Sequence, residues 1–592
     1  MWLINTESLE LKYVTNPWKG SYAILSHTWD YEEVSFQKFS DRESARSMRG
    51  FKKIEEVCRL AKDKHHLQYA WVDTCCIDKS SSAELSEAIN SMYRWYQAAA
   101  VCFVYLSDMT PDTVETKRSG AWSWRDSRGV PRLLSECKWF TRGWTLQELL
   151  APRDVEFYDA NWDFMGTKDS LLEPLSKITG IEPTFLKHGS SIWSASVGTR
   201  MRWAAERETT RPEDIAYCLL GIFEINMPLL YGEGNKAFLR LQEEICKQTN
   251  DLSLFAWTTQ AGHASSLFDK YRGIFATHPC EFAGFQGIER QSGGGTFQGE
   301  LAVTNKGLRL DDTQLYMTSI DGLVLPLDCV GPAPDDSTLE ASYGILLALT
   351  LDGYIRRQPD TLAILPRKLV SNIPPHRIYV KKQLPLQWPN SKGLQDQDVD
   401  ALFFKFEGQL DCILMNVIPQ ESFDYNHTSF LTGGRKFFGY LRLRVGDVGD
   451  VELMIMCWLK RSSPKGDSSR HLEAKYSFAV EGEDDWDRLK IMRLESEIKN
   501  RAVQEGIIPS LLPSPKLTGP KDKMVASLGS SGIEMVMESS KEPKRHQLVI
   551  TFLMTTKEEA ADSNTDLRRL SPHLPLISTN SFTTGRRGAF SV

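Results

Sequence analysis

The run Tyr22-Ala23-Ile24-Leu25-Ser26-His27-Thr28-Trp29 decides how the first part of the chain folds. It opens with four residues typical of a short buried strand and then turns polar. Similar apolar runs follow at residues 69–72, 101–106 and 155–158, and apolar residues recur at helical spacing between the first three runs. Short apolar strands that alternate with helices predict an α/β domain built on a parallel sheet.

Polar side chains stand where each of these predicted strands ends. In an open parallel sheet the ligand crevice lies at the carboxyl ends of the strands. Polar residues also follow strands in α/β proteins that bind nothing there, so a purely structural role is the alternative for each one. Asp159 follows the fourth strand in this way. The candidate ligand-binding residues are Ser26, His27, Trp29, Asp73, Ser107 and Asp108.

The chain changes character twice along its length. Residues 1–165 carry the α/β pattern, and residues 166–250 have helical spacing that predicts a helical extension. From residue 251 onward, short alternating apolar runs separated by Gly, Pro and Asp predict a mostly β region. We divide this region into a β-rich extension over 251–400 and a sandwich-like β domain over 401–560.

Two segments of the C-terminal half lack periodicity. Residues 500–545 are rich in Pro, Ser, Gly and Lys, which predicts a flexible insertion in the last β domain. Residues 561–592 have the composition of a disordered tail. Gln547 to Met554 lies between them and has the alternation of one returning strand.

Composition excludes several classes of protein. The 592 residues carry a net charge of −7, which does not fit a nucleic-acid binder. The sequence contains no apolar run of about 18 residues, so we expect no membrane span. The N-terminus lacks a secretory signal pattern. Eleven scattered cysteines without a Cys-x-x-Cys pair indicate a reduced, cytoplasmic protein and no metal site.

Four segments stand out by their residues, order and spacing. They are Tyr22 to Trp29, Trp71-Val72-Asp73-Thr74-Cys75-Cys76-Ile77-Asp78-Lys79, Trp139-Phe140-Thr141-Arg142-Gly143-Trp144-Thr145-Leu146-Gln147-Glu148, and Thr210-Arg211-Pro212-Glu213-Asp214-Ile215 running on to Gly234. Together they resemble the heterokaryon incompatibility (HET) domain of filamentous fungi, and the resemblance covers about residues 1–250. It implies self/non-self recognition of an innate-immunity type, in which the HET domain triggers programmed cell death. It further implies protein partners and a homo-oligomer formed through this domain, with no cofactor required.

HET domains are similar to TIR domains, which have a flavodoxin-like parallel sheet, and many TIR domains cleave NAD. Some of these enzymes carry an essential glutamate in a Trp-x-x-x-Glu turn, a spacing that Trp144 and Glu148 match. The resemblance therefore implies a second function, an NAD glycohydrolase with NAD as substrate and Glu148 as the essential carboxylate. A carboxylate near the ribose would stabilise the oxocarbenium-like transition state. The alternative is that Glu148 is an early-helix acid and Trp144 a core residue; Thr145 also stands where many TIR enzymes have Cys.

Overall fold

The computed structural model describes the chain except residues 16–20, 110–122, 126–130, 188–190, 260–270, 292–298, 319–321, 334–339, 351, 366–372, 374, 385–400, 409, 411, 426, 433–436, 447–450, 462–471, 481–522, 529–532, 543–544 and 555–592. It divides into two compact units. The first comprises Met1–Gln260, Phe275–Ser292 and Cys329–Glu340. The second comprises Ala261–Ile274, Gly293–Asp328 and Ala341–Val592.

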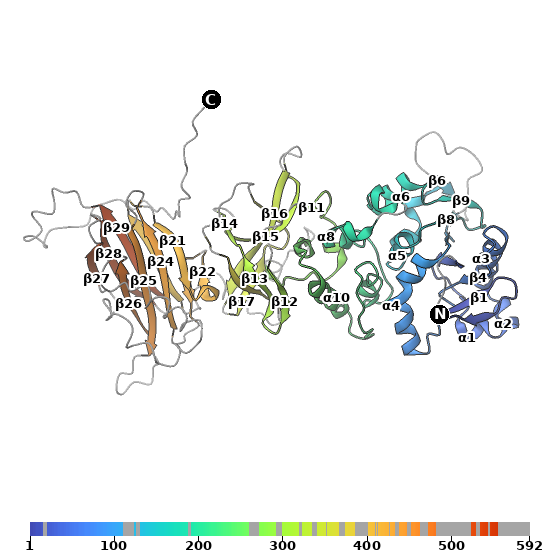
Figure 1. Ribbon diagram of the computed structural model, residues 1–592, viewed down its shortest axis with the longest axis horizontal. Helices are drawn as coiled ribbons and strands as arrows, with labels where there is room; N and C mark the ends of the chain where they lie inside the picture. Colours follow the sequence, from blue (N-terminus) through green and yellow to red (C-terminus); the bar gives the residue numbers. More distant parts are fainter. Residues whose placement is uncertain are drawn as a thin grey trace, which may run out of the picture. The chain divides into compact units, whose positions relative to one another are not determined.

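A seven-stranded sheet of order β2-β1-β4-β3-β5-β8-β9 forms the centre of the first unit (Figure 1). Its parallel strands are β3 (Tyr22–His27), β4 (Tyr69–Trp71), β5 (Val101–Tyr105) and β8 (Val155–Tyr158). These four strands confirm the predicted parallel sheet. Because the first strand, β3, pairs in parallel with both the second and the third, the strand order reverses between β3 and β5. Ligand crevices of open parallel sheets lie at such a point.

Antiparallel strands extend the sheet at both edges. Strands β1 (Trp2–Asn5) and β2 (Leu11–Tyr13) lie beyond β4, and β9 (Phe164–Thr167) lies beyond β8. Neither β1 nor β2 can be predicted from the sequence, because runs of three or four residues have too little periodicity. Strand β9 reaches into the segment expected to be helical, and it pairs with β8 as a short antiparallel edge.

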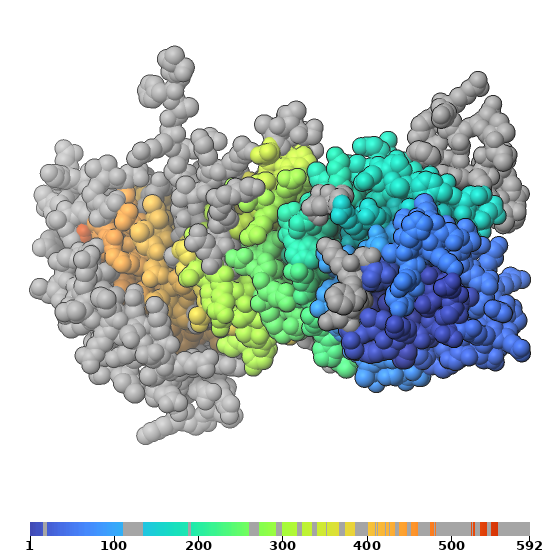
Figure 2. All heavy atoms as spheres, turned by 45° about the vertical axis from the view of Figure 1, so that its right-hand side comes forward, coloured from blue at the N-terminus to red at the C-terminus, as the bar shows by residue number. Residues whose placement is uncertain are grey.

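Helices cover both faces of the sheet (Figure 1). Successive residues of a strand point to opposite faces. From β3, Ser26 contacts helix α5 (Thr145–Leu150), and the next residue, His27, contacts helix α3 (Phe51–Asp63). Helices α5 and α3 therefore lie on opposite faces. Figure 2 shows the residues of this region, in blue to cyan, as a closely packed body.

The ends of two helices can be compared with the local sequence. Ser81 and Glu84 have the spacing of a capping box, and helix α4 (Ser82–Ala98) begins there, with the Ser81 hydroxyl accepting the Glu84 N–H at 3.3 Å. Apolar residues at helical spacing predict a helix over about residues 46–64, whereas helix α3 begins only at Phe51. A Cβ on Gly50 would lie 2.9 Å from the backbone carbonyl oxygen of Glu32, so this position requires glycine. The shorter elements nearby are α1 (Phe36–Phe39), α2 (Arg42–Arg46), β6 (Ser123–Arg125), β7 (Pro131–Leu133), η1 (Leu134–Glu136) and η2 (Lys138–Thr141).

The segment after β9 is helical, as predicted, but its helices are short. The proline-led segment at residue 212 opens a helix of only four residues, α9, which continues as turns. The elements are α6 (Leu172–Thr179), α7 (Pro183–Leu186), η3 (Ile192–Ser194), α8 (Val197–Arg202), α9 (Asp214–Tyr217), α10 (Lys236–Gln248) and η4 (Leu252–Phe255).

The rest of the described chain is mostly β, as predicted. A ten-stranded sheet has the path β11-β15-β16-β17-β19-β13-β12, with β10, β14 and β18 paired beside it. Its strands are β10 (Tyr271–Arg272), β11 (Glu289–Arg290), β12 (Leu301–Thr304), β13 (Gly307–Thr313), β14 (Tyr316–Thr318), β15 (Gly322–Pro332), β16 (Glu340–Thr350), β17 (Gly353–Arg357), β18 (Ala363–Leu365) and β19 (His376–Val380), and η6 (Pro279–Phe282) precedes β11.

Two further sheets form the last β region. Aromatic rings from both sheets meet in one apolar core: Phe404 contacts Tyr476, and Phe430 contacts Phe437. The six-stranded sheet contains β20 (Ala401–Gly408), β22 (Phe423–Asp424), β23 (Ser429–Leu431), β27 (Lys523–Ser527), β28 (Ile533–Glu542) and β29 (Arg545–Met554), and the four-stranded sheet contains β21 (Cys412–Ile418), β24 (Phe437–Val445), β25 (Val451–Arg461) and β26 (Leu472–Val480).

The flexible insertion predicted over residues 500–545 is wrong in its second half. Strands β27 and β28 occupy most of it, and β28 pairs along its whole length with β29. In β28, Ile533, Met535 and Met537 are buried and the residues between them are not. This alternation was present in the sequence but was obscured by the neighbouring Gly, Ser and Lys. Residues 500–522 and the predicted tail 561–592 lie outside the described residues.

No helix among the described residues is both long and apolar enough to cross a membrane.

Candidate functional site

Glu148 lies at the carboxyl end of β3 within a buried hydrogen-bond network. The Ser26 hydroxyl donates to the Glu148 carboxyl at 2.5 Å and accepts the Trp139 indole N–H at 2.7 Å. On α4, the Tyr96 hydroxyl bonds to Glu148 and donates to the Leu25 carbonyl at 2.8 Å. Helix α5 is thus tied to β3 and α4 through one acidic side chain, which is only 7% exposed.

The Glu148 carboxyl is neutral at pH 7. Burial raises its pKa to about 8, outweighing the hydrogen bond from Ser26 that favours the ionised form. A neutral carboxyl completes the network, because its O–H can donate to the Tyr96 hydroxyl while Tyr96 donates to Leu25. An ionised carboxyl would compete with the Leu25 carbonyl for the single Tyr96 proton.

A buried arginine fastens the start of α5. The Arg207 guanidinium donates to the Arg142 carbonyl at 2.8 Å and to the Thr145 hydroxyl at 2.9 Å. Burial lowers the pKa of Arg207 to about 10, partly offset by nearby acidic groups including Glu148. Gly143 lies against the same segment, because a Cβ there would come within 2.6 Å of a Thr209 methyl. Glu148 therefore sits on a helix whose position is closely fixed.

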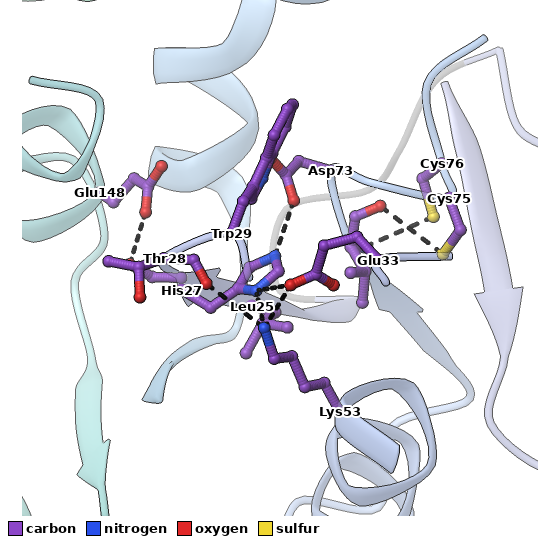
Figure 3. A network of polar contacts seen from close by, with 12 residues as sticks. Leu25, His27, Thr28, Trp29, Glu33, Lys53, Asp73, Cys75, Cys76 and Glu148 are labelled. Carbon is purple, nitrogen blue, oxygen red and sulfur yellow. Dashed lines mark hydrogen bonds and ion pairs between the residues drawn. The ribbon is translucent and has the colours of Figure 1, made fainter. Parts of the chain in front are cut away.

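A second polar cluster lies on the opposite face of β3. The buried His27 ring bonds to the Asp73 carboxylate at 2.9 Å through Nε2, and its Nδ1 lies 3.2 Å from the Lys53 ammonium. Lys53 also forms an ion pair with Glu33 and donates to the Thr28 carbonyl at 3.3 Å. Figure 3 shows Glu148 and Lys53 reaching toward this strand end from different helices. Each charge of the cluster thus faces an opposite charge or the imidazole.

Trp29 joins this cluster to the surface. Its indole N–H donates to Asp73 at 2.7 Å, and the Lys79 ammonium lies 3.6 Å from the centre of the ring. The residue is 57% exposed. The indole is held at its nitrogen and covered by a cation, and these two contacts fix its orientation.

The other predicted site residues have local roles in the geometry. The half-buried Trp144 bonds to the Asp214 carboxylate on α9, whereas Glu148 contacts Ser26 and Tyr96. Asp108 accepts the Lys138 backbone N–H at 3.0 Å. Asp159 accepts two backbone N–H groups within its own turn, and Ser107 is half-buried. The structure thus groups Ser26 with Glu148, and His27 and Trp29 with Asp73.

Sequence reasoning missed five residues of these clusters. Lys53 carried a signal, because it stands at helical spacing before the apolar Val57 on the buried side of α3. Trp139 lay in a segment quoted for the resemblance but was assigned no role. Tyr96, Glu33 and Arg207 gave no signal, because nothing local shows which distant side chain they meet.

This architecture defines an α/β domain with a buried acidic network at its strand ends, and comparisons with known proteins identify its class. Residues 22–148 match the family model described as heterokaryon incompatibility protein (HET). The resemblance noted in the sequence is confirmed: this part of the chain is a HET domain. Residues 236–279 match a domain of unknown function, DUF8212.

A curated relative gives the particular likeness. The chain is 46% identical over 235 residues to the vegetative incompatibility protein HET-E-1 of Podospora anserina. The aligned segment covers 39% of this chain and 16% of that protein. The likeness therefore concerns one part of each protein.

Proposed function

We propose that this chain acts in heterokaryon incompatibility, with its HET domain as the part that triggers programmed cell death. The observation that carries the proposal is the 46% identity to HET-E-1 over 235 residues, together with the HET match over residues 22–148. The domain works in the cytoplasm through protein partners or further copies of itself. The mostly β region acts as the part that senses or regulates.

Expression of the full chain in a filamentous fungus tests this proposal. We expect growth arrest and uptake of a membrane-impermeant dye, and neither from a chain that lacks residues 1–250. Gly143→Trp is the full-length counterpart of that shortened chain. It places a large side chain where even a Cβ lacks room and so disrupts the start of helix α5. Survival of cells that hold the intact chain at high level, under every partner genotype tried, would contradict the proposal.

A second function, NAD glycohydrolysis, is favoured by the position of Glu148. The carboxyl lies at the end of β3, beside the point where the strand order reverses, and the parallel order supports a TIR-like, flavodoxin-like sheet. Glu148 would ionise and stabilise the positive charge that develops on the ribose. In the described conformation it is covered and neutral, so this activity requires α5 to shift.

Nicotinamide release from NAD by the concentrated full chain tests the second function. Glu148→Gln keeps the shape of the neutral side chain and removes only its ability to ionise. Release that disappears in this variant, while it still unfolds cooperatively and at no lower temperature than the parent, would support the enzyme. Equal release by both proteins would remove Glu148 from the chemistry, and no release would leave assembly as the basis of signalling.

A further inference from the structure

The loop after β3 exposes two aromatic side chains. Trp29 is 57% exposed and Tyr31 is 85% exposed. Asp30 and Glu32 alternate with them and are exposed too. Large rings this open to water are uncommon, and together with carboxylates they form a surface suited to arginine or lysine side chains. We call residues 29–32 the aromatic–acidic loop.

This loop is held in one conformation. The Tyr31 N–H donates to the Asp30 carboxylate at 2.8 Å, and the Asp30 N–H donates to Glu33 at 2.9 Å. Glu32 has a φ of 72°, which a residue with a side chain adopts only at a cost. The Gly50 N–H donates to the Glu32 carbonyl at 3.2 Å and keeps it there. A loop fixed in advance loses little entropy when a partner binds.

Basic side chains lie directly beside the loop. Arg46, Arg49 and Lys52 are exposed on the turn from α2 into α3, which we call the basic turn. The Arg49 side chain is 90% exposed and lies 4.0 Å from Glu32. A pair this open contributes little in one molecule. Arg49 is therefore free to reach a second molecule without losing a strong contact.

We propose that the aromatic–acidic loop of one copy of this chain binds the basic turn of a second copy, and the reverse, in a two-fold dimer of the HET domain. The aromatic–acidic loop and the basic turn lie side by side on one surface. A two-fold axis therefore brings each loop against the basic turn of the other copy, so that both contacts form at once. The Arg49 guanidinium of one copy stacks on Tyr31 and pairs with Glu32 of the other. The interface itself is argued from the surface residues alone. Only its role, as the assembly that triggers cell death, rests on the proposed function.

Charge reversal in the full chain tests the interface. Sedimentation velocity over a range of concentrations should show a monomer–dimer equilibrium that weakens as salt rises. Arg49→Glu and Glu32→Arg should each raise the dissociation constant about tenfold or more, because like charges then face each other twice. Arg153→Glu is the control, because Arg153 is 65% exposed and lies outside both patches.

Mixing the two reversed variants gives the decisive result. An Arg49→Glu copy and a Glu32→Arg copy match each other at both contacts, so the mixture should dimerise at concentrations where each variant alone stays mostly monomeric. Tyr31→Ala should weaken the parent dimer without changing its salt dependence. A chain that stays monomeric, or a dimer that ignores both reversals, would overturn the interface and leave the incompatibility proposal intact. A dimer lost in Arg49→Glu while cell death persists would keep the interface and overturn assembly as the trigger.

Discussion

Replacing Glu148 by glutamine should stabilise the first unit at pH 8 and change its stability little at pH 5. The folded carboxyl has a pKa of about 8 through burial, against 4.5 for the free group. Between these values the unfolded chain loses the proton and the folded chain keeps it. Stability of the parent therefore falls as pH rises from about 4.5 to about 8. Glutamine has no proton to lose, and its amide can still accept from Ser26 and donate to Tyr96.

The size of the effect follows from the two pKa values. At about 1.4 kcal/mol per pKa unit, the parent loses roughly 3 kcal/mol relative to Glu148→Gln between pH 5 and pH 8. For a unit of roughly 290 residues that difference corresponds to about 5 °C in melting temperature. Scanning calorimetry of both full-length proteins at the two pH values measures it, and hydrogen exchange of the α5 amides identifies the transition concerned.

Glu213→Gln is the matched control. Backbone N–H groups, including those of Gly232 and Gly234, donate to the Glu213 carboxylate and hold its pKa below the usual value. This carboxyl is mostly ionised in folded and unfolded chains from pH 5 to pH 8, so the effect of its replacement should vary little over that range. A parent–variant difference for Glu148→Gln that is equally flat would refute a neutral, buried Glu148.

Three further substitutions probe the same strand end. Ser26→Ala leaves the Trp139 indole N–H without its acceptor and should cost about 1–3 kcal/mol in a denaturant titration. Gly143→Ala forces a methyl into occupied space and should cost about 1–3 kcal/mol, seen as a lower melting temperature. Lys53→Met should destabilise by about 1–3 kcal/mol because Glu33 loses its ammonium partner, and adding Glu33→Gln should recover much of that loss in a double-mutant cycle.

The sequence predicted the fold wherever a short range of residues decides it. Runs such as Tyr22 to Leu25 are apolar throughout and bounded by polar residues, which is how a strand buried on both faces must read. Ser81 marks the start of α4 because its hydroxyl caps the helix. The edge strands β1 and β2 could not be predicted, because pairing with a neighbouring strand stabilises them and the pattern of their own three or four residues does not.

The site was only partly predictable for a geometric reason. The rule that strand ends gather polar residues correctly indicated Ser26, His27 and Asp73 as neighbours. The rule could not predict which of these residues share a cluster, because adjacent residues of β3 point to opposite faces of the sheet and contact different helices. Ser26 meets Glu148 from a helix more than one hundred residues away. Trp144 matched the expected spacing, but its indole bonds to Asp214 instead of lying over the Glu148 carboxyl.

The two functions proposed for the HET domain make opposite demands on Glu148. An NAD glycohydrolase needs this carboxyl ionised and open to a ribose, whereas the described network keeps it neutral and 7% exposed. Any enzyme of this chain would thus be inactive until something moved α5 away from Ser26 and Tyr96. Binding of a second copy at the loop after β3 acts on the same strand, two to five residues beyond His27, and so is placed to provide that movement. Measuring nicotinamide release in the Arg49→Glu variant therefore separates assembly from catalysis. Release by the parent chain that is lost in this variant would make dimerisation and catalysis parts of one mechanism.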